Sequence, residues 1–161
     1  MNHRNDIDLA YDLLHEAYDY HMDGDYESAI EFYRRSIDAC PTAEAHTFLG
    51  WTFSFQGKLD EAIEECKKAI RIDPEFGNPY NDIGAYLIEK DLYEEAIPWL
   101  KTAAIAKRYE NYHYAHFNLG RAYAALDLLN KAIAEFEQAL KLKPDYDLAT
   151  EALSAIKIQI Q

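Results

Sequence analysis

The sequence predicts an all-α protein, built as an α-solenoid of four helix-turn-helix units followed by a C-terminal capping helix. A pattern of small and apolar residues recurs four times, at spacings of 33, 34 and 36 residues. Self-similarity at such a period is typical of repeat architectures. Val is absent, whereas Ala, Leu, Ile, Glu and Lys abound, which favours helices over strands. The 6 Gly and 5 Pro are few for an all-β chain of 161 residues with many tight turns.

Each unit is marked by small residues at three matched places. The first set contains Ala17, Gly50, Gly84 and Gly120. The second set, each followed by Ile, contains Ala29, Ala62, Ala96 and Ala132. The third set contains Ser36, Ala69, Ala103 and Ala139. We expect these residues to let the two helices of a unit approach closely, while larger residues fill the gap toward the next unit: Tyr33, Cys66, Leu100 and Phe136.

This pattern resembles the tetratricopeptide repeat family over roughly residues 10 to 146. Pro41, Pro74 and Pro144 close three of the units, whereas the third has Arg108 there and carries two extra residues. The resemblance implies a right-handed superhelix and a single domain over residues 1–161. The repeats lie at about 10–42, 43–76, 77–112 and 113–146, with a capping helix at 145–161. Because one helix pair cannot bury its apolar face alone, the units are expected to stack.

The apolar spacing predicts a helix pair in each repeat. The expected helices span 5–22 and 26–38, 43–55 and 59–71, 77–89 and 93–107, and 110–125 and 129–141. Gly24 and Gly57 suit the left-handed residue that ends a helix. Asp91, followed by Glu94, has the form of a capping box. Pro98 lies inside the expected helix 93–107 and predicts a kink or an opened turn.

The resemblance implies that the first helices line a concave groove. The candidate peptide-binding residues are Tyr11, Tyr18, Trp51, Phe55, Asn78, Asn81, Tyr114, Phe117 and Arg121. Aromatic residues and Arg dominate binding energy at protein interfaces, and exposed apolar patches mark binding sites. The asparagines suit a peptide backbone, and Arg121 suits a carboxylate. The alternative is that the aromatics pack between helices, and Phe55 is the aromatic least expected to face the groove.

Some members of the family grip a C-terminal carboxylate with Lys, Asn and Arg spread over three repeats. The fifth position of each repeat here holds Leu14, Thr47, Asn81 or Phe117, none of them Lys. The only matching pair, Asn118 and Arg121, falls in one repeat. The sequence therefore argues against a chaperone-tail adaptor of that type.

The formal net charge of -13 argues against binding to nucleic acid or to an anionic membrane, since both require a basic surface. A basic peptide or protein patch would be attracted, although the charge also serves solubility. The first residues lack the apolar core of a signal peptide, and no apolar stretch approaches the ~20 residues of a membrane span. With two cysteines, Cys40 and Cys66, expected to be reduced, these features predict a cytoplasmic protein. Cys66 is expected in the core and Cys40 nearer the surface.

No motif for catalysis or for a cofactor stands out, so we expect neither an enzyme nor a bound cofactor. Glu110, His113 and His116 share a helix face at metal-ligand spacing, but a di-iron site would require a second such motif. The prediction is therefore no metal site. The favoured function is an adaptor that binds a peptide or protein segment in the aromatic groove. The alternatives are a self-assembling homo-oligomeric scaffold and, third, metal or substrate handling at Glu110, His113 and His116.

Overall fold

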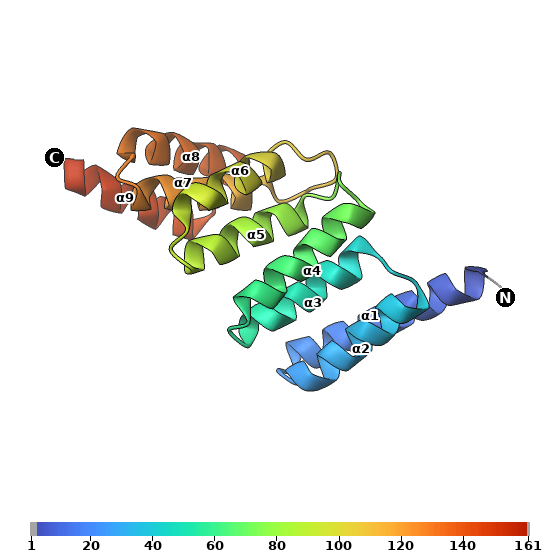
Figure 1. Ribbon diagram of the computed structural model, residues 1–161. Helices are drawn as coiled ribbons and strands as arrows, with labels where there is room; N and C mark the ends of the chain where they lie inside the picture. The colour runs from blue at the N-terminus through green and yellow to red at the C-terminus, as the bar shows by residue number, and fades with distance from the viewer. Residues whose placement is uncertain (1–2, 161) are drawn as a thin grey trace. The chain divides into compact units, whose positions relative to one another are not determined.

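The computed structural model describes residues 3–160, with side chains for residues 5–159, and divides into two compact units, Met1–Pro74 and Glu75–Gln161. The helices of the first unit are α1 (His3–Met22), α2 (Tyr26–Ala39), α3 (Ala43–Phe55) and α4 (Leu59–Ile72) (Figure 1). The helices of the second unit are α5 (Asn78–Glu89), α6 (Tyr93–Ala103), α7 (Tyr112–Ala125), α8 (Leu129–Leu142) and α9 (Asp147–Ile160). The predicted all-α fold is confirmed, and no strand is assigned between residues 3 and 160. None of these helices is both long enough and apolar enough to cross a bilayer.

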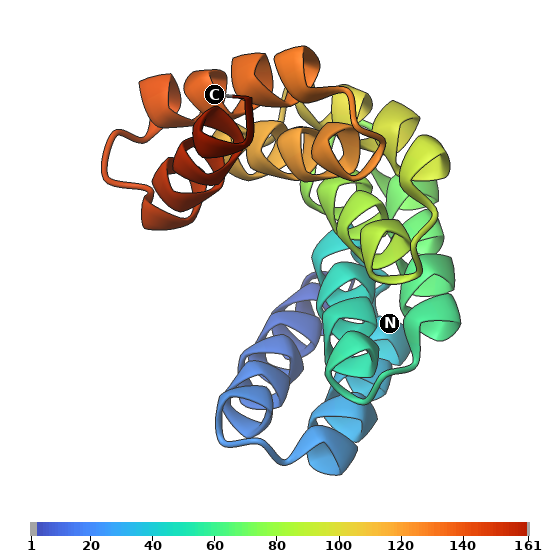
Figure 2. The same cartoon turned by 90° about the vertical axis from the view of Figure 1, so that its left-hand side faces the viewer.

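Each unit consists of two helix pairs in two layers. In the first unit, α1 packs on α2 and α3 on α4, while α3 also contacts both α1 and α2 (Figure 2). In the second unit, α5 pairs with α6 and α7 with α8, and α7 contacts both α5 and α6. Helix α9 packs on α8 and buries Ala149 and Ile156, as expected of a cap. Within each unit, the first helices of the two pairs, α1 with α3 and α5 with α7, therefore lie side by side in one layer.

The matched small residues lie where the helices of a pair meet. A Cβ added to Gly50 would stand 2.8 Å from the carbonyl oxygen of Ala62, and one added to Gly120 would stand 2.5 Å from the ring of Phe136. Phe136 thus covers the glycine of its own repeat, rather than only the gap toward the next one. Tyr33, by contrast, stacks on Phe48 of the following repeat, as expected.

The turns inside the four pairs share one backbone conformation. Gly24 and Gly57 have φ values of 80° and 73°, as predicted, and Asp91 and Asp127 have φ values of 58° and 57° at the matching places. The capping-box prediction is therefore wrong: Leu92 is the N-cap of α6, and Asp91 ends α5 in the left-handed conformation. Asp tolerates this conformation better than most residues because its short side chain can hydrogen-bond locally, and Asp91 accepts a bond from the Tyr93 hydroxyl.

Asp127→Gly is expected to raise the free energy of unfolding by about 0.5 kcal/mol. Glycine removes the Cβ strain of the left-handed conformation, although it also makes the unfolded chain more flexible. Urea unfolding measures the change. Asp127→Asn controls for the lost charge, and Gly57→Ala should lower stability by about 1 kcal/mol. Equal or lower stability of Asp127→Gly would contradict this account of the turn.

The third repeat departs from the predicted helix boundaries. Helix α6 ends at Ala103 instead of 107, and α7 begins at Tyr112 instead of 110. The intervening loop folds against the start of α5: the Gly77 amide donates to the Arg108 carbonyl at 3.0 Å, and Tyr109 is buried beside Gly77. The extra residues therefore form a small folded loop rather than additional helix.

Helix α6 continues through Pro98 without an opened turn, so that part of the prediction is wrong. Because proline has no N–H, the carbonyl four residues before Pro98 lacks its usual amide partner. Pro98 is exposed, so this carbonyl lies on the solvent side of the helix. The cysteine expectations are confirmed, since Cys66 is buried and Cys40 is half-buried.

A buried His–Glu pair joins the two helices of the second repeat. His46 Nδ1 lies 2.7 Å from Glu65 Oε2, both residues are buried, and Lys68 bonds to the other oxygen of Glu65. Burial raises the pKa of Glu65, but the bonds from His46 and Lys68 outweigh it and hold the pKa below its ordinary value. His116 and Glu135 repeat the pair in the fourth repeat at 2.6 Å, nearer the solvent. Both histidines, His46 and His116, therefore bond to a glutamate on the second helix of their own repeat.

Candidate functional site

The exposed aromatic side chains gather on the first helices. Among the side chains that the structure describes, four aromatics are exposed, and all lie on α1, α3 or α7. They are Tyr11 at 45%, Tyr18 at 39%, Phe55 at 54% and Tyr114 at 39%. All four belong to the predicted groove set. Phe55, the aromatic least expected to face the groove, is the most exposed of the four and stands at the last residue of α3.

In the first unit, an aromatic cluster underlies this surface and joins α1 to α3. The His21 ring stacks on Trp51 with ring centroids 3.9 Å apart, and Phe55 packs edge-on against both rings. Tyr18 lies edge-on to Phe48 at 5.7 Å. Trp51 is therefore half-buried, and much of its ring supports the exposed aromatics instead of facing solvent.

His21 holds this cluster in register through one hydrogen bond. Its Nδ1 lies 2.8 Å from the Thr52 hydroxyl, which itself donates to the Phe48 carbonyl. Because that hydroxyl proton is already used, Nδ1 is the donor and carries a hydrogen. Burial lowers the pKa of His21, which favours the neutral ring. The cluster under the first-unit surface thus favours an uncharged aromatic stack.

In the second unit, the predicted aromatics lie around Tyr146, which precedes α9. Phe117 is half-buried between the rings of Phe136 at 5.7 Å and Tyr146 at 5.1 Å. Tyr114 packs edge-on against Tyr146 at 5.7 Å while remaining exposed. Sequence reasoning missed Tyr146 because it follows the closing Pro144, outside any first helix.

A chain of amides holds Arg121 at the surface of α7. Asn118 donates to Asn81 Oδ1 at 3.0 Å, and Arg121 donates to Asn118 Oδ1 at 3.1 Å. Asn81 is buried, so its side chain positions Asn118 and is not open to a peptide backbone. Arg121 is exposed beside an apolar pocket of about 350 Å³ that α9 helps to line through Ala152 and Ile156. Asn118 is a further residue that sequence reasoning did not place in the groove set.

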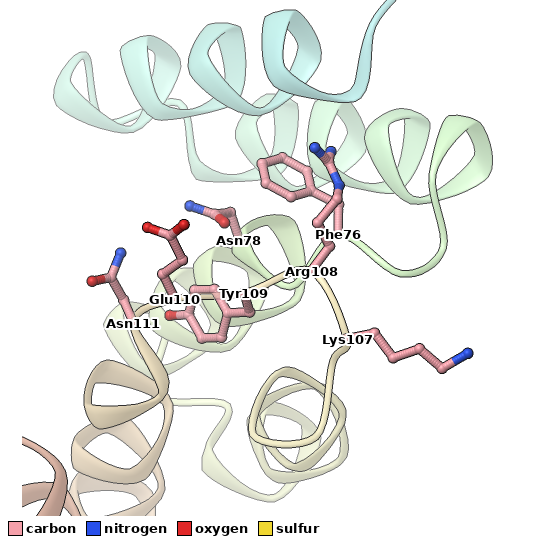
Figure 3. A pocket seen from close by; sticks show the side chains of 7 residues that line it. All are labelled: Phe76, Asn78, Lys107, Arg108, Tyr109, Glu110 and Asn111. Carbon is pink, nitrogen blue, oxygen red and sulfur yellow. The ribbon is translucent and has the colours of Figure 1, made fainter.

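Asn78 lies apart from the other predicted residues. It lines a pocket of about 370 Å³ at the start of α5 and the 107–111 loop, beside Glu110 and Asn111 (Figure 3). Arg108 lies over the Phe76 ring at 4.4 Å, and Lys107 pairs with Glu75 at 2.7 Å. Asn78 therefore belongs to the folded loop of the third repeat rather than to the aromatic surface.

The residues of the metal hypothesis do not come together. His116 bonds to Glu135, Glu110 lines the loop pocket, and His113 is buried against the rings of Tyr114 and Tyr146. Burial lowers the pKa of His113, which favours the neutral ring. Among the described residues, no group of three or more His, Cys, Asp or Glu side chains could hold a metal ion.

Three segments match models of the tetratricopeptide repeat: residues 10–44, 43–76 and 113–146. They coincide with the first, second and fourth repeats. The small glutamine-rich tetratricopeptide repeat-containing protein 2 of Mycosarcoma maydis is 36% identical over 74 residues, which are 45% of this chain and 21% of that protein. The chain spans less than a third of the length of the first curated relatives that it matches.

Two solved structures extend the comparison. PilF of Pseudomonas aeruginosa superposes with a TM-score of 0.91 at 23% identity, covering 96% of this chain and 70% of that one, which shows a shared fold. The first tetratricopeptide domain of Spaghetti (RPAP3), bound to the HSP90 peptide SRMEEVD, superposes with a TM-score of 0.69 at 26% identity. It covers 74% of this chain and 93% of that one.

Proposed function

Because the chain belongs to the tetratricopeptide repeat family, whose fold typically serves protein interaction rather than catalysis, we propose that it is an adaptor that binds a peptide or protein segment on its first-helix surfaces. The observation that carries this proposal is the placement of the four exposed aromatics, all on α1, α3 and α7. Large aromatic side chains supply much binding area at little entropic cost, and exposed groups of them mark binding surfaces.

The structure favours different roles for the predicted residues. Tyr11, Tyr18 and Phe55 are the contact residues of the first unit, with Trp51 as their support. In the second unit, Tyr114, Phe117 and Arg121 form the contact surface. Asn81 acts through Asn118 on Arg121, and the exposed guanidinium beside an apolar pocket suits a carboxylate next to an apolar side chain. The complex of Spaghetti (RPAP3) with its peptide supports a polypeptide as the ligand class.

The test is a selection of random displayed peptides on the full chain, followed by affinity measurement on variants. Tyr11→Ser/Phe55→Ser removes two exposed aromatics. It is expected to lower the affinity for those selected peptides that bind to the first unit by at least about tenfold. The control Ile105→Ser/Leu142→Ser removes two exposed apolar side chains outside the first helices and should leave affinity unchanged. Circular dichroism verifies that both variants fold. Failure to select any peptide, or equal losses in the two variants, would contradict the proposal.

Self-assembly is the second candidate, and the outer side of α9 favours it. Leu148 is 54% exposed and Ile158 is 75% exposed on this helix. Exposed apolar residues on the outside of a helix suit contact with a second copy of the chain. Sedimentation over a wide concentration range decides between the candidates, because a persistent monomer excludes assembly as the function.

A further inference from the structure

The first-unit surface carries an apolar stripe along α1 that continues onto α3. Ile7, Tyr11, Tyr18 and Met22 are exposed by 41%, 45%, 39% and 61%, and their sequence spacing places them on one side of the helix. On the side of α3, His21 packs against Phe55, and the centroids of the two rings are 5.1 Å apart. Ile7, Tyr11, Tyr18, Met22 and Phe55 are here called the α1 stripe, a row of exposed apolar side chains.

A row of aspartates runs beside the α1 stripe. Asp8, Asp12, Asp19 and Asp23 each follow one residue after a member of the stripe, so they lie about 100° around the helix from it. All four are exposed, and none forms an ion pair with another side chain in the part of the chain that the structure describes. From Asp8 to Asp23 the row spans about 22 Å, which matches roughly seven residues of extended peptide.

The charges of the first unit are segregated between its two layers. Residues 5–25 and 43–57, which cover α1 from Asn5 onward, α3 and their following turns, contain eight Asp and Glu and no Lys or Arg, while Arg4 lies in the first turn of α1. The cations of this unit with described side chains lie on the second helices or just before them: Arg34, Arg35, Lys58, Lys67, Lys68 and Arg71. From Asn5 onward, the charged side chains of the layer that exposes the aromatics are therefore all Asp or Glu.

The α1 stripe and the aspartate row together indicate which kind of polypeptide segment would bind here. An acidic or neutral segment would bring carboxylates against the aspartate row or leave the row unpaired. A segment that alternates Lys or Arg with apolar residues places cations on the aspartates and over the faces of Tyr11 and Tyr18, while its apolar side chains cover the stripe. Resting on the proposed function, we infer that the first unit binds a basic, partly apolar polypeptide segment along α1, with the aspartate row setting the preference.

The probe is a fluorescent peptide of about ten residues in which Arg alternates with Leu, paired with the same peptide carrying Glu in place of Arg. Asp12→Asn/Asp19→Asn/Asp23→Asn neutralises part of the row without changing side-chain size. Glu27→Gln/Glu31→Gln/Asp38→Asn makes the same change in net charge on exposed positions of α2. All measurements use the full chain.

The basic peptide is expected to bind, and the acidic peptide not to bind. Affinity for the basic peptide should fall at least about tenfold in the α1 triple variant and change little in the α2 triple variant. For the unchanged chain, affinity should also fall at least about tenfold when the salt concentration rises from about 50 to 500 mM. Equal losses in both triple variants would overturn the inference, since that result reports net charge only. Binding of both peptides, or of neither, would also overturn it. If the selected peptides depend on Tyr11 and Phe55 but not on the aspartates, the inference fails while the proposed function stands.

Discussion

Glu65→Ala is expected to lower the free energy of unfolding by about 3 kcal/mol, because it leaves His46 buried without its carboxylate partner. Glu65 and His46 are each 8% exposed, and Lys68 loses its bond to the same carboxylate. Urea unfolding at pH 7, followed by circular dichroism, measures the loss.

The same pair predicts a pH dependence with a definite sign. The pKa of Glu65 in the folded chain lies below its ordinary value of 4.5. Its stabilising contribution is therefore fully present above pH 4.5 and is lost as the pH falls through the folded value. The stability difference between the wild type and Glu65→Ala should thus narrow as the pH falls below 4.5.

Glu135→Ala provides the matched control for Glu65→Ala. The side chains of His116 and Glu135 are 19% and 25% exposed, so water compensates more of the loss. We expect a cost of about 1 kcal/mol. Equal costs for the two variants would show that burial does not set the strength of these pairs.

Gly50→Ala is expected to lower the free energy of unfolding by about 2 kcal/mol, even though Ala is the better helix former. The added Cβ would lie 2.8 Å from the Ala62 carbonyl oxygen and 3.3 Å from Cys66 Sγ. Because the nearest atom belongs to the backbone of α4, a side-chain rotation cannot relieve the contact and the two helices must separate. Urea midpoints of the variant and the wild type measure the cost.

The first repeat supplies the control, since it carries Ala17 at the matching place. Ala17→Gly should also destabilise, by about 1 kcal/mol, for the opposite reason: it removes a fitted methyl group and lowers helix propensity. If Gly50→Ala were as stable as the wild type or more so, close approach of the helices would not be the reason for glycine at this place.

The fold was predictable because its determinants are local and repeated. The small-residue sets, at Gly50 and Ala62 for example, fix helix pairing through contacts within one repeat. One error falls where a tertiary contact overrides the pattern, and another where a local turn does. The burial of Tyr109 against Gly77 shortens α6, and the left-handed backbone of Asp91 depends on the end of α5 rather than on the start of α6.

The candidate site was predictable in part. The resemblance to the tetratricopeptide repeat family placed Tyr11, Tyr18 and Tyr114 in the predicted groove set, and all three side chains are exposed. It could not predict the His21–Trp51 stack or the bond between Asn118 and Asn81, which join different helices. Nor could it show that Phe55 is exposed, because Phe55 stands at the last residue of α3, where no further turn of that helix covers it.

Hydrogen exchange of the full chain, with and without a selected peptide, tests the central claim most directly. The account predicts that added protection concentrates in α1 and α3, or in α7 and its neighbour α5, because α1, α3 and α7 carry the exposed aromatics and Arg121. Protection confined to α2, α4, α6 or α8 would contradict it, because the ligand would then lie on the second-helix layer.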